Sequence, residues 1–577
     1  MRRCLPRQLT PMTTDKNIRL VLCWHMHQPD YRDHVQDQIQ FPWTYLHAIK
    51  DYTDMAAHLE ASPRARAVVN FSPILLEQLD CYERQIQHCL SSGEPPRDVL
   101  LAALEAAVFP SELEQRLALV KSCLRSNRKN LIGGFESYGR LVRIADLIIL
   151  EKDCGLYLSN QYLADLVTWY HLAWMGETVR RTHPQVKSLI AQGSGYTLHQ
   201  RRELLAIIGE QIASLRRRYR KLADDGRVEL SMSPYGHPML PLLLDFNAAR
   251  EALPTSPLPA NPAYPGGLER SKWHLEQGLK TFEAYFGHRP QGCWPSEGGI
   301  SAATLDLLAG AGFRWTASGE SVLRNSLRHS TANSQGIDPI YNAWSRPGST
   351  LRLYARNDLL SDRIGFMYAD WNADHAVADL LNQIEQIGAH YRGNSEPIVS
   401  IIMDGENAWE YFPFNAYYFL SALYTRLSDH PRIRLSTYAD LLAVGPAQEL
   451  PRVTAGSWVH GTFSTWIGNA DKNRAWDILA DAKRCYDEEI ARGGRDAAKL
   501  EQLAKQLAVC EGSDWFWWFG DYNPAESVSD FERLYRAHIA NLYDILGREP
   551  PQYLTQILSH GTGAPKMGGV MRPGQPG

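Results

Sequence analysis

An apolar run that ends abruptly in carboxylates constrains this chain more than any other stretch. Residues 398–403 read Ile-Val-Ser-Ile-Ile-Met, the composition of a strand that is buried on both faces. The chain then turns polar at once, with Asp404, Glu406 and Trp409 close behind. Strands of an α/β barrel present side chains to a substrate at their carboxyl ends. The pattern therefore predicts that Asp404 lies in a functional site.

A second acid stands in a comparable stretch, because Glu297 follows a short apolar segment and a tryptophan, Trp294. About a hundred residues separate Glu297 from Asp404, so only the fold can bring them together. Cleavage of a glycosidic bond needs two carboxyl groups that flank the bond, and aromatic rings stack on sugars. The two acids are either such a pair or unrelated residues of surface loops.

Short apolar strands alternate with helical segments, which predicts a mostly parallel sheet. We expect an α/β fold, a closed or nearly closed barrel at 18–445, with a helical insertion at about 96–181. Polar residues that a core would not select collect at the expected strand ends. They are His25, His27, His237, Glu297 and Asp404.

After residue 445 the pattern becomes amphipathic, and we expect a C-terminal helical domain at 446–557. Its expected helices are 473–490, 496–509 and 530–546. Two aromatic loops accompany them: 456–469 could line a substrate groove, whereas we expect 513–521 to pack the helices onto the barrel. The ends, 1–17 and 558–577, are expected to be disordered.

The composition narrows the class of partner. A net charge of −4 argues against nucleic acid or an anionic membrane as a partner. The nine cysteines are odd in number and lack C-x-x-C spacing, which favours reduced thiols in a cytoplasmic protein. No apolar run is long enough for a transmembrane helix, and the first residues lack the apolar core of a secretory signal.

Four short blocks in order resemble glycoside hydrolase family 57, the α-glucan-active enzymes, and the resemblance runs from about residue 18 to 557. The blocks are His25–Pro29, Tyr235–Pro241, Trp294–Gly298 and Asp404–Glu410, and the candidate for a fifth is Trp458–Asn469. The resemblance implies a distorted seven-stranded (β/α) barrel followed by a helical domain. It also implies a retaining mechanism on α-1,4 or α-1,6 glucans without a metal or other cofactor.

On this resemblance, Glu297 is the nucleophile and Asp404 the general acid/base, with the pKa of Asp404 raised so that it starts protonated. The histidines would bond sugar hydroxyls and the tryptophans would stack on sugar rings; Glu406 would either tune Asp404 or cap the following turn. The expected substrate-binding residues are His25, His27, His237, Trp294, Trp409, Glu406 and Trp466.

Several functions remain open. The first is α-amylase-like hydrolysis of starch, glycogen or maltodextrin, and the second is transfer, as in a 4-α-glucanotransferase or a branching enzyme. Water and a sugar hydroxyl compete for the same intermediate, so the outcome depends on loop closure and acceptor binding. A zinc-dependent hydrolase that uses His25, His27, His237 and a carboxylate is a third possibility, and a non-catalytic glucan-binding protein a fourth. The oligomeric state is left open.

Overall fold

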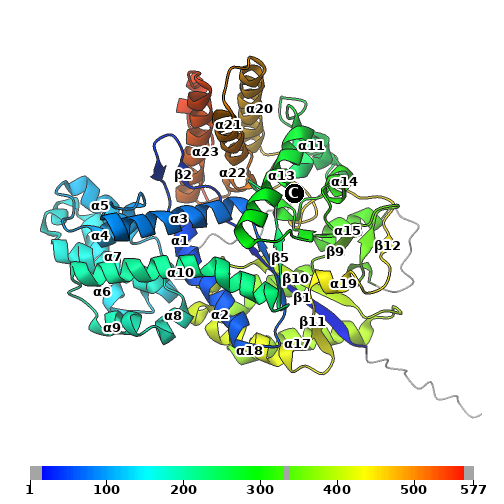
Figure 1. The fold of residues 1–577 in the computed structure, drawn as a ribbon, viewed down its shortest axis with the longest axis horizontal. Helices are drawn as coiled ribbons and strands as arrows, with labels where there is room; N and C mark the ends of the chain where they lie inside the picture. Colours follow the sequence, from blue (N-terminus) through cyan, green and yellow to red (C-terminus); the bar gives the residue numbers. More distant parts are fainter. Residues whose placement is uncertain (1–15, 329–337, 564–577) are drawn as a thin grey trace, which may run out of the picture.

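A curled sheet at the centre of the molecule carries the strand ends predicted above. The computed structural model describes residues 16–328 and 338–563 (Figure 1). Seven parallel strands run in the spatial order β10, β1, β4, β5, β6, β7, β9. They are β1 (Ile18–Met26), β4 (Ala67–Phe71), β5 (Val228–Met232), β6 (Gly292–Cys293), β7 (Trp315–Ser318), β9 (Arg352–Ala355) and β10 (Ile398–Asp404).

The two ends of this strand row approach each other. Arg356, directly after β9, forms a parallel bridge with Ser400 of β10, and Asn357 N donates to Ser400 O at 2.8 Å. The short strands β8 (Trp344–Ser345) and β12 (Gln448–Glu449) extend the sheet beyond β9, and β11 (Ile433–Leu435) pairs with β1. The predicted distorted (β/α)7 barrel is confirmed.

The register of the strands decides which side chains meet. In the parallel ladders, His25 of β1 is aligned with Asp404 of β10 on one side and with Asn70 of β4 on the other. β1 and β10 are buried almost throughout, as their apolar runs predict. His25 and Asp404 therefore stand where these two apolar strands end.

The expected helical insertion at about 96–181 lies between β4 and β5 and runs further than expected, through α9. It projects to one side of the barrel, to the left in Figure 1, and the long helix α10 leads back to β5. Its helices are α4 (Val99–Glu105), α5 (Leu113–Ser122), α6 (Glu136–Leu150), α7 (Asn160–Trp174), α8 (Glu177–Thr182), α9 (Pro184–Gln192) and α10 (Leu198–Asp224).

The described part of the C-terminal region carries the α-helices α20 (Ala470–Ala491), α21 (Ala497–Cys510), α22 (Ser513–Trp518) and α23 (Ala525–Leu546). The helices α20, α21 and α23 stand together above the barrel in Figure 1. Helix α23 begins at Ala525, earlier than the expected 530, and ends where Gly547 adopts a left-handed φ of 78°. The aromatic segment expected to be a loop at 513–521 contains the helix α22.

Two expected boundaries shift. The segment between 446 and 469 belongs to the barrel, because β12 pairs with β8 and Gly456 bridges Ile300. At the carboxyl end, residues 558–563 are packed: Gly563 N donates to Asn523 O at 2.9 Å. The remainder of the expected disordered ends, 1–15 and 564–577, lies outside the described residues. Within the described ranges, no helix could cross a membrane.

Candidate active site

Asp404 stands at the carboxyl end of β10, where the strand register sets it beside His25. The side-chain amide of Asn407 donates to Asp404 Oδ2 at 2.9 Å. The guanidinium of Arg356 is buried and donates to Ile402 O at 2.8 Å. Asp404, Asn407 and Arg356 line one cavity, and the charge of Arg356 lowers the pKa of Asp404.

Glu297 follows β6 in a left-handed backbone conformation, with a φ of 58°. This region is disfavoured for a residue with a side chain, by about 1–3 kcal/mol, and persists only where the surroundings impose it. Two segments distant in the sequence do so. Trp458 Nε1 donates to Glu297 Oε2 at 3.1 Å, and Ser513 Oγ donates to Oε1 at 3.2 Å.

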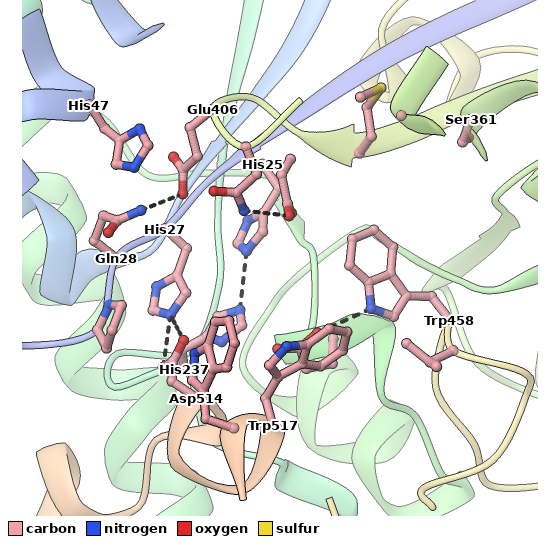
Figure 2. A pocket seen from close by; sticks show the side chains of 18 of the residues that line it. His25, His27, Gln28, His47, His237, Ser361, Glu406, Trp458, Asp514 and Trp517 are labelled. Carbon is pink, nitrogen blue, oxygen red and sulfur yellow. Dashed lines mark hydrogen bonds and ion pairs between the residues drawn. The ribbon is translucent and has the colours of Figure 1, made fainter. Parts of the chain in front are cut away.

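Glu297 and Asp404 line one cavity of about 570 Å³ at the carboxyl ends of the strands. Figure 2 shows how its labelled side chains converge: His25, His27 and His237 meet on one side, and Trp458 approaches from the other. The structure therefore brings together the two acids and the three histidines that the sequence singled out.

Burial dominates the electrostatics of both acids. It raises the pKa of Glu297 to about 8; the carboxylates of Asp514 and Asp404 add to the rise, and the hydrogen bonds from Trp458 and Ser513 oppose it. Burial also raises the pKa of Asp404, in the direction expected from the sequence, whereas Asn407, His27 and Arg356 lower it. A pKa of about 8 favours the protonated form of Glu297 near neutral pH, whereas the expected role of nucleophile needs the ionised form.

His25 and His237 bond to each other rather than pointing freely into the cavity. Their Nε2 atoms lie 3.1 Å apart, His25 Nδ1 lies 2.7 Å from Asn70 Oδ1, and His237 Nδ1 lies 2.9 Å from Ser513 Oγ. Burial lowers the pKa of His25 to about 3, and that of His237 well below its usual range. Both rings are therefore neutral, and all four ring nitrogens already have partners.

His27 has a different environment, because its ring reaches the C-terminal helices. Its Nδ1 lies 2.7 Å from Ser72 Oγ, and its Nε2 lies 3.0 Å from each carboxylate oxygen of Asp514. The ring also stacks on His237, with 3.8 Å between the ring centroids. Asp514 thereby adds a carboxylate from the C-terminal helices to the acids that line the cavity.

Sequence reasoning missed Ser513 and Asp514, because it assigned the aromatic segment at 513–521 to packing. Helix α22 carries both residues, and its Trp517 and Trp518 also line the cavity. The signal was present: Asp514 stands directly before a run of aromatic residues, and a tryptophan likewise lies within a few residues of Glu297 and of Asp404.

The three tryptophans expected to stack on sugars do not line the cavity. Trp294, Trp409 and Trp466 are 0%, 1% and 0% exposed. Trp294 packs in the barrel interior, edge-on against Trp458. It directly follows β6 and precedes the turn that carries Glu297 to the cavity. Other indoles line the cavity in their place: Trp43, Trp174, Trp458, Trp517 and Trp518.

Glu406 lines the cavity and is only 2% exposed. Its Oε1 accepts a hydrogen bond from Gln28 Nε2 at 2.8 Å, so the carboxyl does not act as the cap of its own turn. Burial raises its pKa well above the usual range, and the charge of Asp404 adds to the rise. Asp404 therefore influences Glu406, and the expected role of Glu406 in tuning Asp404 stays a prediction.

Comparison with known proteins decides the family. The profile of glycosyl hydrolase family 57 matches residues 21–454. The chain belongs to this family. The resemblance read from the sequence is confirmed, and with it the assignment to enzymes that cleave or transfer glycosidic bonds. No curated protein matches the chain.

Solved structures share the family 57 fold over most of their length. A branching enzyme from Thermococcus kodakaraensis matches with a TM-score of 0.55 and 15% identity, over 91% of this chain and 90% of that one. A branching enzyme from Pyrococcus horikoshii matches with a TM-score of 0.54 and 16% identity, over 96% and 99%. The α-amylase AmyC from Thermotoga maritima matches with a TM-score of 0.54 and 14% identity, over 93% and 96%.

One group in this family 57 site has donors that could hold a metal ion. A nitrogen of His27, a nitrogen of His237 and a carboxylate oxygen of Asp514 lie within 4.8 Å of one another. Asp514 supplies the carboxylate of the ligand set considered from the sequence, and His25 is not part of this group. In this arrangement both nitrogens of His237 bond to His25 and Ser513, so binding a metal would break one of those bonds.

Proposed function

We propose that this chain is a retaining glycoside hydrolase that acts on α-glucans such as starch, glycogen or maltodextrin, in the manner of an α-amylase. Glu297 serves as the nucleophile and Asp404 as the general acid/base. The observation that carries the proposal is the shared cavity, in which Glu297, fixed by two donors, and Asp404 are brought together at the carboxyl ends of β6 and β10.

The reaction proceeds in two displacements. Protonated Asp404 gives its proton to the glycosidic oxygen while a carboxylate oxygen of Glu297 attacks the anomeric carbon, so that the leaving chain departs with a new hydroxyl. Asp404, now ionised, then takes a proton from the incoming water, whose oxygen displaces Glu297. Burial favours the protonated start of Asp404, and Trp458 and Ser513 stabilise Glu297 as a carboxylate.

The substrate class is supported by family membership and by the lining of the cavity. The solved relatives are named as branching enzymes and an α-amylase, which act on α-glucans. Five indoles along the cavity offer apolar faces on which sugar rings stack, while histidine, glutamate and asparagine side chains offer bonds to hydroxyls. His27 and Glu406 are the side chains we propose for the hydroxyls nearest the catalytic pair.

A second candidate is transfer to another glucan, as in a 4-α-glucanotransferase or a branching enzyme. This candidate is supported by tryptophans that line the cavity but do not come from the strand ends. Trp43 lies in helix α1 (Trp43–His47), Trp174 in the insertion and Trp517 in α22. Such a surface provides contacts for an acceptor chain that would compete with water for the covalent intermediate.

Incubation with maltoheptaose, amylose and pullulan, followed by product sizing and linkage analysis, tests both candidates. Shorter products alone indicate hydrolysis, longer ones indicate transfer, and new α-1,6 linkages indicate branching. Glu297→Gln and Asp404→Asn should each lower kcat by at least about a thousandfold. Near-normal turnover by either variant would show that the residue has another role.

A further inference from the structure

A continuous chain of side-chain contacts leads from the interior of the barrel to Glu297. Asn70 contacts His25, His25 contacts His237, His237 contacts Ser513, and Ser513 contacts Glu297. The first four of these residues are all buried. The chain joins β4, β1 and the turn after β5 to α22, and so connects the barrel to the C-terminal helices.

The number of protons in this chain restricts their positions. A neutral imidazole carries one N–H and one bare nitrogen, and a serine hydroxyl donates one proton. His25 and His237 face each other through Nε2, so one ring must carry its proton there and the other must not. Likewise, the single proton of Ser513 can point to His237 Nδ1 or to Glu297 Oε1, but not to both.

These restrictions leave two complete arrangements. In the first, His25 donates from Nδ1 to Asn70, His237 donates from Nε2 to His25, and Ser513 donates to His237. Glu297 must then be protonated, and it donates to Ser513. Asn70 has the orientation of this first arrangement, with Oδ1 toward His25 and Nδ2 donating to Ser231 at 3.0 Å, whereas the Ser513 hydroxyl faces Glu297 Oε1 as in the second.

In the second arrangement Glu297 is ionised and every donor is reversed. Ser513 donates to Glu297, His237 donates from Nδ1 to Ser513, and His25 donates from Nε2 to His237. Asn70 turns its amide so that Nδ2 faces His25, and Ser231 and Ser233 rotate their hydroxyls to match. The proton lost by Glu297 leaves to the solvent, while Ser513 and each ring keep one proton.

We propose that Asn70, His25, His237 and Ser513 form a hydrogen-bond relay that couples the protonation of Glu297 to the tautomers of the two histidines. This inference rests on the proposed role of Glu297 as nucleophile. In it, His25 and His237 are positioning residues rather than ligands of the sugar. Their task is to leave Ser513 free to donate to Glu297 once Glu297 is ionised.

Backbone geometry supports a built relay. His237 has a φ of 55° and Glu297 one of 58°, so both residues near its active-site end adopt the disfavoured left-handed conformation. The backbone N–H of Ser513 also donates to His237 O at 2.9 Å, which fixes the two residues relative to each other.

Other charged groups face the relay and bias it. Asp404 and Asp514 face Glu297 and favour its protonated form, whereas His27 stacks on His237 and, when charged, disfavours a charge on either of the other rings. None of these groups belongs to the chain of contacts. Their influence is therefore the same in all variants that leave them in place.

Neutron diffraction at about pH 6 and about pH 10 tests the coupling, because it locates the hydrogens directly. We expect deuterium on His237 Nε2 at the lower pH and on Nδ1 at the higher one. The amide of Glu297→Gln does not ionise, so its hydrogen bond with Ser513 should keep one direction at both pH values. His237 should therefore keep one tautomer at both pH values. The same tautomer at both values in the wild type would overturn the proposal, as would a change of tautomer in Glu297→Gln.

Kinetics supply a second readout, with a matched pair of serines. Ser513→Ala should shift the acid limb of the kcat/KM profile to a pH about one unit higher, because the ionised nucleophile loses a donor. At pH values below that limb, kcat/KM should fall about tenfold. Ser72→Ala removes a hydroxyl that contacts His27 outside the relay and should leave the acid limb in place. An unmoved limb in Ser513→Ala would contradict the relay. Absence of any activity on glucans would contradict the proposed function, yet the tautomers would still report on the relay.

Discussion

The indole N–H of Trp458 donates to Glu297 Oε2 at 3.1 Å, across 161 residues of sequence. Trp458 is itself held on two sides, edge-on by Trp294 with 5.4 Å between ring centroids, and by the guanidinium of Arg356 at 5.3 Å from its ring. Because Arg356 also lies close enough to Asp404 to lower its pKa, one tryptophan links the surroundings of both acids.

Replacing Trp458 with phenylalanine keeps the packing and removes the donor to Glu297. We expect kcat/KM to fall about tenfold or more at neutral pH, because a hydrogen bond to a charged group contributes about 1.5–3 kcal/mol. The pH profile should show the acid limb at higher pH. Trp371→Phe, at an exposed position outside the cavity, is the matched control and should have the wild-type profile.

The raised pKa of Glu297, about 8, predicts the pH dependence of both activity and stability. The mechanism needs ionised Glu297 and protonated Asp404, so kcat/KM should rise as Glu297 ionises over the pH range in which Asp404 keeps its proton. Because the folded pKa exceeds the unfolded one, the stabilisation from protonated Glu297 is complete below about 4.5 and is lost as the pH rises to about 8.

Glu297→Gln isolates this contribution, because glutamine cannot ionise. Thermal unfolding should show a melting temperature a few degrees above wild type at about pH 9 and nearly equal to it at about pH 4. Equal differences at both pH values would contradict the raised pKa.

Lys472 should position the helix that carries Ser513 and Asp514. Its buried ammonium donates at 2.5 Å to Thr465 O and to Phe516 O, and so joins the segment that follows Trp458 to the end of α22. Lys472→Met leaves both carbonyls without their donor, so we expect kcat/KM to fall about tenfold and stability to fall by about 1–3 kcal/mol. Lys505→Met, at a partly exposed lysine, serves as the control, and equal losses in both variants would exclude a specific role.

Glu511 should be essential to the stability of the same region. Its buried carboxylate accepts from Arg270 at 2.7 Å and lies 2.7 Å from His274 Nε2; the Arg270 guanidinium holds its pKa at about 2. Glu511→Gln leaves Arg270 buried without a counter-charge. We expect the free energy of unfolding, measured with urea at neutral pH, to fall by about 3–5 kcal/mol.

The acid side of the same prediction follows from linkage. The lowered pKa of Glu511 supplies stability above about 4.5 that is lost as the pH falls toward about 2, so the variant should lose less stability than wild type over that range. Glu501→Gln, on the exposed side of the neighbouring helix, should match wild type in both measurements.

Removal of divalent metals should leave turnover of maltoheptaose unchanged. Both nitrogens of His237 have hydrogen-bond partners, and the proposed displacement uses only carboxyl groups. Dialysis against EDTA, with zinc measured before and after, checks this. Loss of activity together with one equivalent of zinc, and recovery on adding zinc back, would instead assign His27, His237 and Asp514 as metal ligands.

The sequence by itself determined the barrel and its local chemistry. Apolar runs such as 398–403 predict buried strands, and the side chain that follows a parallel strand lies at the carboxyl-end edge of the sheet. For that reason His25, His237, Glu297 and Asp404 could be identified before the fold was known, and the structure gathers them in one cavity.

Only the tertiary structure decided which side chains complete the site. Trp294 and Trp458 both lie near acids or glycines in sequence, yet one fills the barrel interior and the other bonds to Glu297. Ser513 and Asp514 reach the cavity because α22 packs over the strand ends, a contact between parts of the chain more than two hundred residues apart. Local pattern reports which face of an element is buried; the partner on that face is set by long-range packing, which no local pattern contains.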